Sequence, residues 1–188
     1  MTENESAGER IERFRGYLTL LARMNLAERL RSKVDASDIV QDTMLQAYRG
    51  FGEFRGQNDG QMAAWLRTIL ANNLAHARRD FGRNKRDVSR ERSIHVELDN
   101  SSARLEAWLA ADQSSPSEGA TRHENILRVC AALEKLPEAQ REAVQLHYLH
   151  GMKLSEVGER LGRSPAAVAG LLKRGLTKLR DELDQSAQ

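Results

Sequence analysis

The sequence of 188 residues has little of what disulfide-bonded, membrane-spanning or sheet-rich proteins contain. A single cysteine excludes a disulfide framework, and no apolar run reaches the roughly 18 residues of a membrane span. Three prolines, 5% aromatic residues and the lack of alternating Val, Ile and Thr runs argue against a β-sheet. The polar N-terminus has no apolar signal core, so we expect an intracellular, cytoplasmic protein.

The composition instead favours helices, because Leu, Ala, Arg and Glu are abundant and hydrophobic residues make up 40% of the chain. The net charge of +2 hides an uneven distribution, with +4 in residues 1–90, −4 in residues 91–125 and +2 in residues 126–188. We therefore predict an all-α fold with two small helical domains, residues 8–87 and 121–184. A flexible, acidic, Ser-rich linker over residues 88–120 would join them.

Three amphipathic segments predict the helices of the first domain. They cover residues 8–31, a stretch capped near Asp35 that runs to Tyr48, and a long stretch from Gln61. The apolar side predicted for the second helix comprises Ile39, Val40, Met44, Leu45 and Tyr48. A glycine-punctuated loop over residues 50–60 separates it from the third. Trp108, within the linker, lies on a short amphipathic stretch with Leu105 and Leu109. This stretch predicts a single helix, which either docks on another surface or packs on its own chain.

The C-terminal stretch from Leu154 to Leu179 predicts a helix-turn-helix. Gly162 suits the turn, Ser164 suits an N-cap, and Pro165 suits the first position of the second helix. Four residues form the predicted inward stripe of that helix: Val168, Leu172, Gly175 and Leu179. Three cations, Lys173, Arg174 and Lys178, lie off the stripe, as expected for a helix that enters the DNA major groove. A plain helical hairpin in a bundle remains the alternative.

The sequence has no pattern typical of catalysis or of cofactor binding. Cys130 lies among apolar residues, as a core residue does, and there is no phosphate-binding glycine loop. His147 and His150 share a helix face, but no Cys or carboxylate pattern completes a metal site. We therefore expect no enzyme activity, metal or cofactor. The basic run over residues 78–90 could follow a phosphate backbone or could be an ordinary solvated helix end.

Two blocks of the sequence together resemble a bacterial RNA polymerase sigma factor of the extracytoplasmic-function (ECF) group. The first reads ASDIVQDTMLQAYRGFGEFRG, followed by AWLRTILANNLAHARRDFGRNKR, and is similar to sigma region 2. The second reads LEKLPEAQREAVQLHYLHGMKLSEVGERLGRSPAAVAGLLKRGLTKLRDEL and is similar to sigma region 4. The resemblance implies binding to core RNA polymerase and promoter DNA, and promoter-specific transcription initiation. It also raises an anti-sigma protein as a partner, which the sequence does not decide.

The resemblance assigns roles to three sets of residues. For polymerase binding it implies Asp38, Gln41 and Asp42, although acids early in a helix also complement its dipole. For the unwound −10 element it implies Arg55, Gln57, Asn58, Asp59, Met62, Asn72, Arg78, Arg79, Arg83, Lys85 and Arg86. For the −35 duplex it implies Arg163, Ser164, Pro165, Ala166, Ala167, Ala169, Gly170, Lys173, Arg174 and Lys178.

The recognition helix departs from the family pattern. Its expected outer face reads Ala166, Ala167, Ala169, Gly170 and Leu171, where family members often carry polar or basic residues. Such residues offer few of the bidentate hydrogen bonds that identify a base. We therefore expect groove shape and phosphate contacts to carry more of the reading. Two other functions remain open: a dimeric helix-turn-helix regulator, and a helical protein-interaction adaptor without a DNA role.

Overall fold

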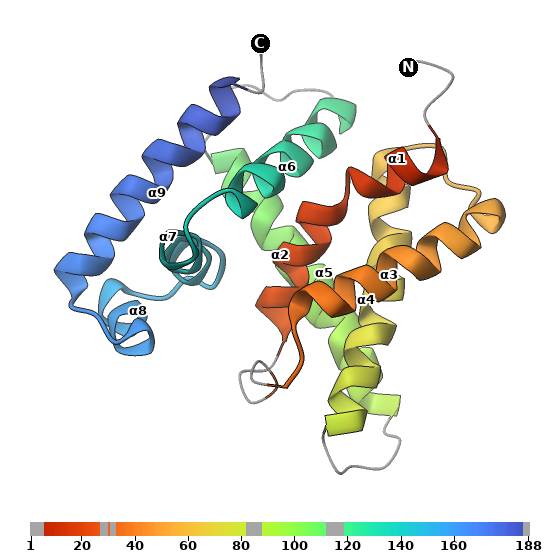
Figure 1. Ribbon diagram of the computed structural model, residues 1–188, viewed down its shortest axis with the longest axis horizontal. Coiled ribbons are helices and arrows are strands. Elements are labelled where there is room, and N and C mark those ends of the chain that lie inside the picture. Colours follow the sequence, from red (N-terminus) through yellow and green to blue (C-terminus); the bar gives the residue numbers. More distant parts are fainter. Residues whose placement is uncertain (1–5, 27–29, 31–32, 82–87, 112–118, 186–188) are drawn as a thin grey trace. The chain divides into compact units, whose positions relative to one another are not determined.

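The computed structural model describes residues 6–26, 30, 33–81, 88–111 and 119–185 (Figure 1). Within these ranges the chain forms helices and no β-strand, which confirms the predicted all-α fold. Nor does any of these helices have the length and apolar character needed to cross a membrane. The chain divides into two compact units: unit 1 holds Met1–Ala103 and Ser117–Leu127, and unit 2 holds Arg104–Pro116 and Arg128–Gln188. The predicted domain borders at residues 87 and 121 stay predictions.

Unit 1 contains α1 (Ala7–Glu12), α2 (Arg15–Asn25), α3 (Ala36–Gly50) and α4 (Asp59–Phe81). The first of the three predicted helices is thus two helices, which meet at Arg13 and Phe14. Helix α3 begins where predicted, because the Asp35 side chain accepts a hydrogen bond from the Ser37 amide (2.9 Å). Helix α3 packs against both α2 and α4. Side chains four residues apart on α4 are fully buried and form the centre of the core: Met62, Leu66, Leu70 and Leu74.

The predicted apolar side of α3 is wrong for two of its residues. The buried face consists of Ala36, Ile39, Val40, Thr43, Met44 and Ala47. Leu45 is 46% exposed and Tyr48 is 62% exposed. A helix of 3.6 residues per turn cannot turn all five predicted residues to one side. Leu45 and Tyr48 therefore share the outer face of α3 with its acidic residues.

The prediction of a flexible linker from residue 88 is also wrong, because helix α5 spans Val88–Ala111. Ser101 and Ser102, which indicated a linker, are buried and hydrogen-bonded within unit 1. The Ser102 hydroxyl pairs with the hydroxyl of Tyr17 (3.0 Å), and the side-chain NH2 group of Asn25 donates to the Ser101 hydroxyl (3.1 Å). Serine disfavours a helix only while its hydroxyl lacks a better partner than the backbone. Partners on α2 supply that here, so residues 93–102 belong to the packed unit.

Unit 2 contains α7 (Glu138–Val144), α8 (Leu154–Leu161) and α9 (Pro165–Gln185), and α7 continues into a π-helical turn over Gln145–Leu149. Helix α6 (Gly119–Glu134) contributes residues to both units. Cys130 is fully buried on α6, and burial raises the pKa of its thiol far above the ordinary value, as a core cysteine requires. The Trp108 ring stacks on Tyr148 (centroids 5.7 Å apart), so the short apolar stretch of the linker packs on its own chain.

Candidate nucleic-acid interface

Helices α8 and α9 form the predicted helix-turn-helix, which lies at the blue end of the chain (Figure 1). Gly162 ends α8 in the left-handed conformation, with φ +62°. The Arg163 amide donates to the Gly158 carbonyl (2.8 Å), and a Cβ on Gly158 would stand 2.6 Å from the Arg163 carbonyl oxygen. The Ser164 hydroxyl caps α9 by accepting from the Ala167 amide (3.2 Å). The turn is therefore fixed by two glycines and one cap.

The predicted inward stripe of α9 is confirmed. Val168, Leu172, Gly175 and Leu179 are all buried. Gly175 allows a close approach to α7, since a Cβ there would come within 3.2 Å of the Val144 methyl carbon. Leu171 was placed on the outer face, but it is only 8% exposed and belongs to the buried side. The outer face is therefore even poorer in side-chain atoms than the sequence indicated.

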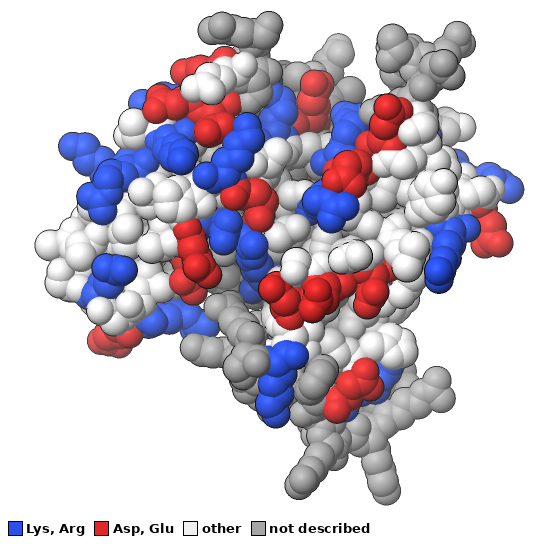
Figure 2. Space-filling view, viewed as in Figure 1, with Lys and Arg blue, Asp and Glu red and all other residues white. Residues whose placement is uncertain are grey.

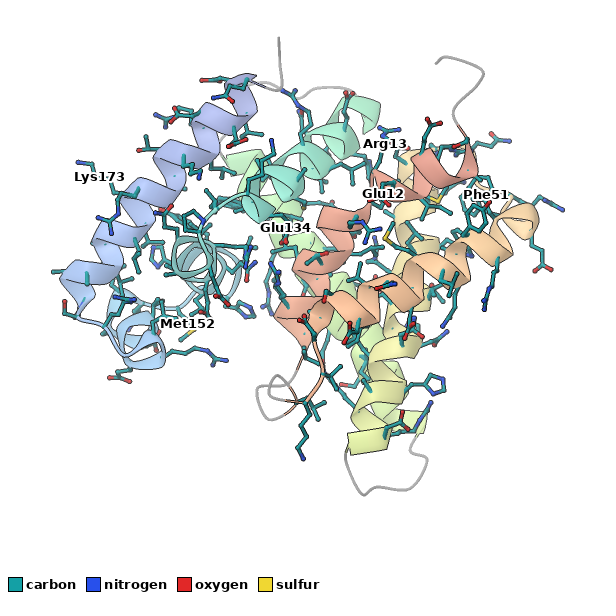
Figure 3. The ribbon with its side chains drawn as sticks, viewed as in Figure 1. Glu12, Arg13, Phe51, Glu134, Met152 and Lys173 are labelled. Atoms are coloured by element: carbon teal, nitrogen blue, oxygen red, sulfur yellow. The ribbon has the colours of Figure 1, made fainter. Side chains whose placement is uncertain are left out.

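The outer face of α9 presents small residues first and cations later. Its exposed residues are Pro165, Ala166, Ala167, Ala169, Lys173, Arg174, Thr177 and Lys178, preceded in the turn by Arg163 and Ser164. Lys173 extends away from the helix (Figure 3). The Arg174 guanidinium folds back over Gly170, with Nη1 3.3 Å from where a glycine Cβ would stand. The first two turns can thus touch a groove wall or a thymine methyl, while charge is confined to the later turns.

Charge along the whole length of α9 is mixed rather than uniformly basic, because acidic residues follow the cations. Figure 2 shows Lys and Arg side chains interspersed with Asp and Glu along α9. On α9 itself, Asp181 and Asp184 are exposed beyond the cations. A mixed surface gives weak long-range attraction to a polyanion, so affinity would have to come from direct phosphate contacts.

The second predicted DNA-contacting region, the loop before α4, is held by its own hydrogen bonds. The Asn58 side chain accepts from the Gln61 amide (2.9 Å), and the Gln61 side chain accepts from the Gln57 amide (2.6 Å). Asp59 pairs with Arg13 at the junction of α1 and α2 (3.3 Å; Arg13 is labelled in Figure 3). The polar residues of the loop are therefore partly engaged by the protein itself.

Arg55 lies in this loop, whereas Met62 lies in the first turn of α4. The Arg55 side chain is exposed and donates to the Gly52 carbonyl (2.8 Å). Met62 is only 1% exposed and lies in the core, so the structure does not bring it to the surface with the other predicted residues. The residue instead anchors the start of α4.

An aromatic cluster that the sequence analysis did not predict lies beside the loop. The Phe54 ring stacks on Trp65 (centroids 4.9 Å apart) and lies 6.1 Å from Phe51. The same Phe54 ring lies over Gly56, where a Cβ would overlap it. Trp65 is half-buried in this cluster. Gly56 is thus required by the close approach of an aromatic ring to the backbone.

Asn72 lies on an exposed stripe of α4, and Arg78 lies elsewhere. The stripe, at spacings of three or four residues, consists of Gln61, Ala64, Thr68, Asn72 and His76. Arg79 joins it through a hydrogen bond to the His76 ring (2.8 Å). Arg78 instead donates to the Asn25 carbonyl (2.8 Å) and to Glu97 on α5 (2.9 Å). These contacts tie α4 to α2 and α5, and they do not support a contact between Arg78 and DNA. Arg83, Lys85 and Arg86 lie outside the described residues.

The outer face of α3 carries the residues predicted to bind polymerase. Asp38, Gln41, Asp42, Leu45 and Tyr48 follow one another at helical spacing, and all are exposed. Asp38 lies in the first turn, where its charge also complements the helix dipole. Leu45 and Tyr48 were not among the residues predicted to bind polymerase. Their signal was present, since they fall at positions i+7 and i+10 from Asp38. No group of three metal-ligating side chains is found among the residues described.

Two family models match the chain, and each covers one of the two sequence blocks. The model "Sigma-70 region 2" matches residues 11–84, and the model "Sigma-70, region 4" matches residues 126–179. Together they span α2 to α4 and most of α6 to α9, so the α3 face, the loop before α4 and the outer face of α9 lie inside them.

Curated relatives agree with these models. A probable RNA polymerase sigma factor RfaY of Xanthomonas campestris is 32% identical over 156 residues, which are 82% of this chain and 36% of the relative. The ECF RNA polymerase sigma factor SigG of Mycobacterium tuberculosis is 30% identical, over 77% of this chain and 41% of the relative. The ECF RNA polymerase sigma factor EcfG of Rhodopseudomonas palustris is 31% identical, over 77% of this chain and 68% of the relative.

The chain spans well under half of the length of the first two relatives and about two thirds of the third. The similarity nevertheless runs through both regions of the chain in the same order. With both region models matched, the chain belongs to the sigma-70 family of RNA polymerase sigma factors, in the ECF group.

Proposed function

We propose that this chain is a dissociable subunit that binds core RNA polymerase and directs it to specific promoters. The observation that carries the proposal is the presence, in one chain, of an acidic and apolar helix face on α3 and a helix-turn-helix with a cationic outer face. The first suits a protein partner and the second suits a nucleic acid. The chain performs no catalysis itself in this proposal, because the polymerase supplies it.

The proposed docking site for polymerase is the outer face of α3. Exposed Leu45 and Tyr48 provide apolar surface, and its burial by a partner would stabilise the complex. Asp38 and Asp42 flank that area, so a partner with basic side chains at the edge of an apolar patch would fit it. An anti-sigma protein that blocks initiation would compete for the same face.

The proposed duplex contact is the outer face of α9 with the turn before it. Arg163, Lys173, Arg174 and Lys178 would contact phosphates, and Ser164 and Pro165 would approach the groove edge. Ala166, Ala167, Ala169 and Gly170 would sit against the groove, where they admit close approach but donate no side-chain hydrogen bond. This arrangement reads a −35 element mainly by its shape and backbone.

The proposed contact with the unwound −10 strand is the loop before α4 with the exposed stripe of α4. Single-stranded bases need stacking surfaces and polar edges. Gln57 and Asn72 are exposed amides at the two ends of this surface, and Arg55 and Arg79 supply charge for phosphates. Arg83, Lys85 and Arg86 extend the proposal to a part of the chain outside the described residues.

The test is run-off transcription with purified core polymerase and a library of promoter fragments. We expect transcripts that start at defined positions and require this chain, and co-elution of the chain with core polymerase. A chain that neither co-elutes with polymerase nor supports any start site would end the proposal. A dimeric regulator, the remaining alternative, would bind duplex DNA equally well without polymerase.

A further inference from the structure

The loop before α4 is preset by a reciprocal pair of caps. Asn58 immediately precedes Asp59, the first residue of α4, and so occupies the N-cap position. Its side-chain oxygen accepts from the Gln61 amide (2.9 Å), while the Gln61 side-chain oxygen accepts from the Gln57 amide (2.6 Å). Each side chain thereby satisfies a backbone N–H that would otherwise lack a partner in the protein. The arrangement is a capping box displaced by one residue, and it fixes the backbone of residues 57 and 58.

The same loop is anchored on its C-terminal side by a buried residue. The Met62 amide donates to the Asn58 carbonyl (3.0 Å), and the Met62 side chain is 1% exposed. Asp59 is held by Arg13 (3.3 Å) and lies at the positive end of the α4 dipole. Between these restraints, Gln57 is exposed, and only its backbone amide is used in the cap.

We propose that Asn58 and Gln61 are positioning residues, and that Gln57 is the residue of this loop whose side chain meets a base. The inference rests on the proposed function of the loop, namely capture of the unwound strand. It reverses the sequence-based prediction for Asn58, because the hydrogen bond that its side-chain oxygen accepts from the Gln61 amide holds the side chain at the start of the helix. A loop backbone that is already fixed before binding raises the affinity for the DNA strand, because the loop loses less conformational freedom when it binds.

The inference is tested with the full-length protein bound to core polymerase. The probe is a fluorescent single-stranded DNA selected from a random pool with the wild-type complex. Asn58→Ala and Gln61→Ala should each weaken binding about 5- to 10-fold for every sequence, since the cost of a lost cap does not depend on the base. Asn58→Ser keeps a capping oxygen but has no amide, so it should bind within about twofold of wild type. Gln57→Ala should weaken binding and flatten the preference at one base position.

A second measurement reports on the cap directly. Hydrogen exchange at the Gln57 backbone amide should become at least about tenfold faster in Gln61→Ala, because the Gln61 side-chain oxygen that accepts its hydrogen bond is removed. The same amide should exchange at the wild-type rate in Asn72→Ala, which changes an exposed side chain of α4 outside the cap.

Three outcomes would each overturn a different part of the proposal. If Asn58→Ser binds as weakly as Asn58→Ala and changes a base preference, Asn58 reads a base and the positioning role is wrong. If Gln57 exchange is unaffected by Gln61→Ala, the reciprocal cap does not hold the loop. If no sequence is enriched from the pool by the wild-type complex, the proposed function of the loop fails instead.

Discussion

Helices α3 and α9 have similar inner faces and opposite outer faces. Each buries an apolar stripe in its own unit, Ile39 and Val40 being typical of α3 and Val168 and Leu172 of α9. Outside, α3 carries acids with Leu45 and Tyr48, whereas α9 carries alanines followed by lysine and arginine. The inner pattern builds the fold, and the outer pattern selects the partner.

The two outer faces differ in how much free energy their burial against a partner contributes. Exposed aliphatic and aromatic side chains are unfavourable in water and stabilise a complex when a partner buries them. Small residues with flanking cations gain little from burial, but they let a helix approach a polyanion and release its counterions. Helix α3 therefore suits a protein surface and α9 suits a duplex.

The largest expected effect comes from removing the apolar part of the α3 face. Leu45→Ala combined with Tyr48→Ala should weaken binding to core polymerase by about 30-fold or more, the effect expected of an interface hot spot. Binding of duplex DNA by the free protein should not change. Titration of labelled core polymerase measures the first, and fluorescence anisotropy measures the second.

A matched control for this pair is Val96→Ala on α5, which shortens another side chain that is 54% exposed. Its affinity for polymerase should equal that of wild type. Equal binding by the double variant and the control would remove α3 from the proposed docking site and would erase the contrast with α9.

The next effect concerns the turn that aims α9. Gly158→Ala should lower the free energy of unfolding by about 1–3 kcal/mol, because its Cβ would overlap a backbone oxygen that no rotamer can move. Urea unfolding followed by circular dichroism measures the loss. Gly170→Ala is the control, because its Cβ meets only the flexible end of Arg174 and alanine favours a helix by about 1 kcal/mol. Equal stability of both variants would mean that Gly158 does not constrain the turn.

A smaller effect should separate phosphate contact from shape reading on α9. Lys173→Ala combined with Arg174→Ala should lower the slope of log affinity against log salt by about two, one for each lost phosphate contact. Affinity for core polymerase should stay unchanged, the reverse of the α3 result. Lys135→Ala removes an exposed cation that pairs with Glu182 in the same unit and should leave the slope unchanged. A slope unaffected by the double variant would exclude this face as the duplex contact.

The smallest effect is expected at Glu97, which joins α5 to α4. Burial alone would raise its pKa, but the hydrogen bonds from Arg78 and Ser93 outweigh burial and leave the pKa below its ordinary value of 4.5. A lowered carboxyl pKa stabilises the fold above pH 4.5, and that contribution is lost as pH falls through the lowered value. Glu97→Gln should therefore cost up to about 1 kcal/mol near neutral pH, as exposed ion pairs do. The difference should vanish in acid, and a difference that persists there would contradict it.

The sequence was most informative where local chemistry decides conformation. Asp35, Gly162 and Ser164 act on backbone groups within three residues of themselves, so their roles as caps and turn are confirmed. Asn58 followed three residues later by Gln61 was a capping signature of the same kind, and it could have been recognised. The capping role of Asn58 therefore had a local signal in the sequence, but Asn58 was predicted only as a DNA contact.

The sequence misled where a distant partner decides the outcome. Ser101 and Ser102 indicated a linker, yet they are buried because Tyr17 and Asn25, more than 70 residues away, satisfy their hydroxyls. Arg78 was predicted as a phosphate contact, and nothing in the sequence indicated that it also donates to Glu97 on α5 and to a carbonyl on α2. Such pairings depend on which helices lie side by side, and no periodicity records that.

By itself, the sequence determined the helical class, the helix-turn-helix and the cationic outer face of α9, because these follow from spacing and capping within one helix or turn. Only the tertiary structure decided that residues 93–102 are packed helix, that Leu45 and Tyr48 face outward, and that Asn58 is engaged in a cap. Burial is a property of the assembled unit: a side chain is inside only when another element covers it.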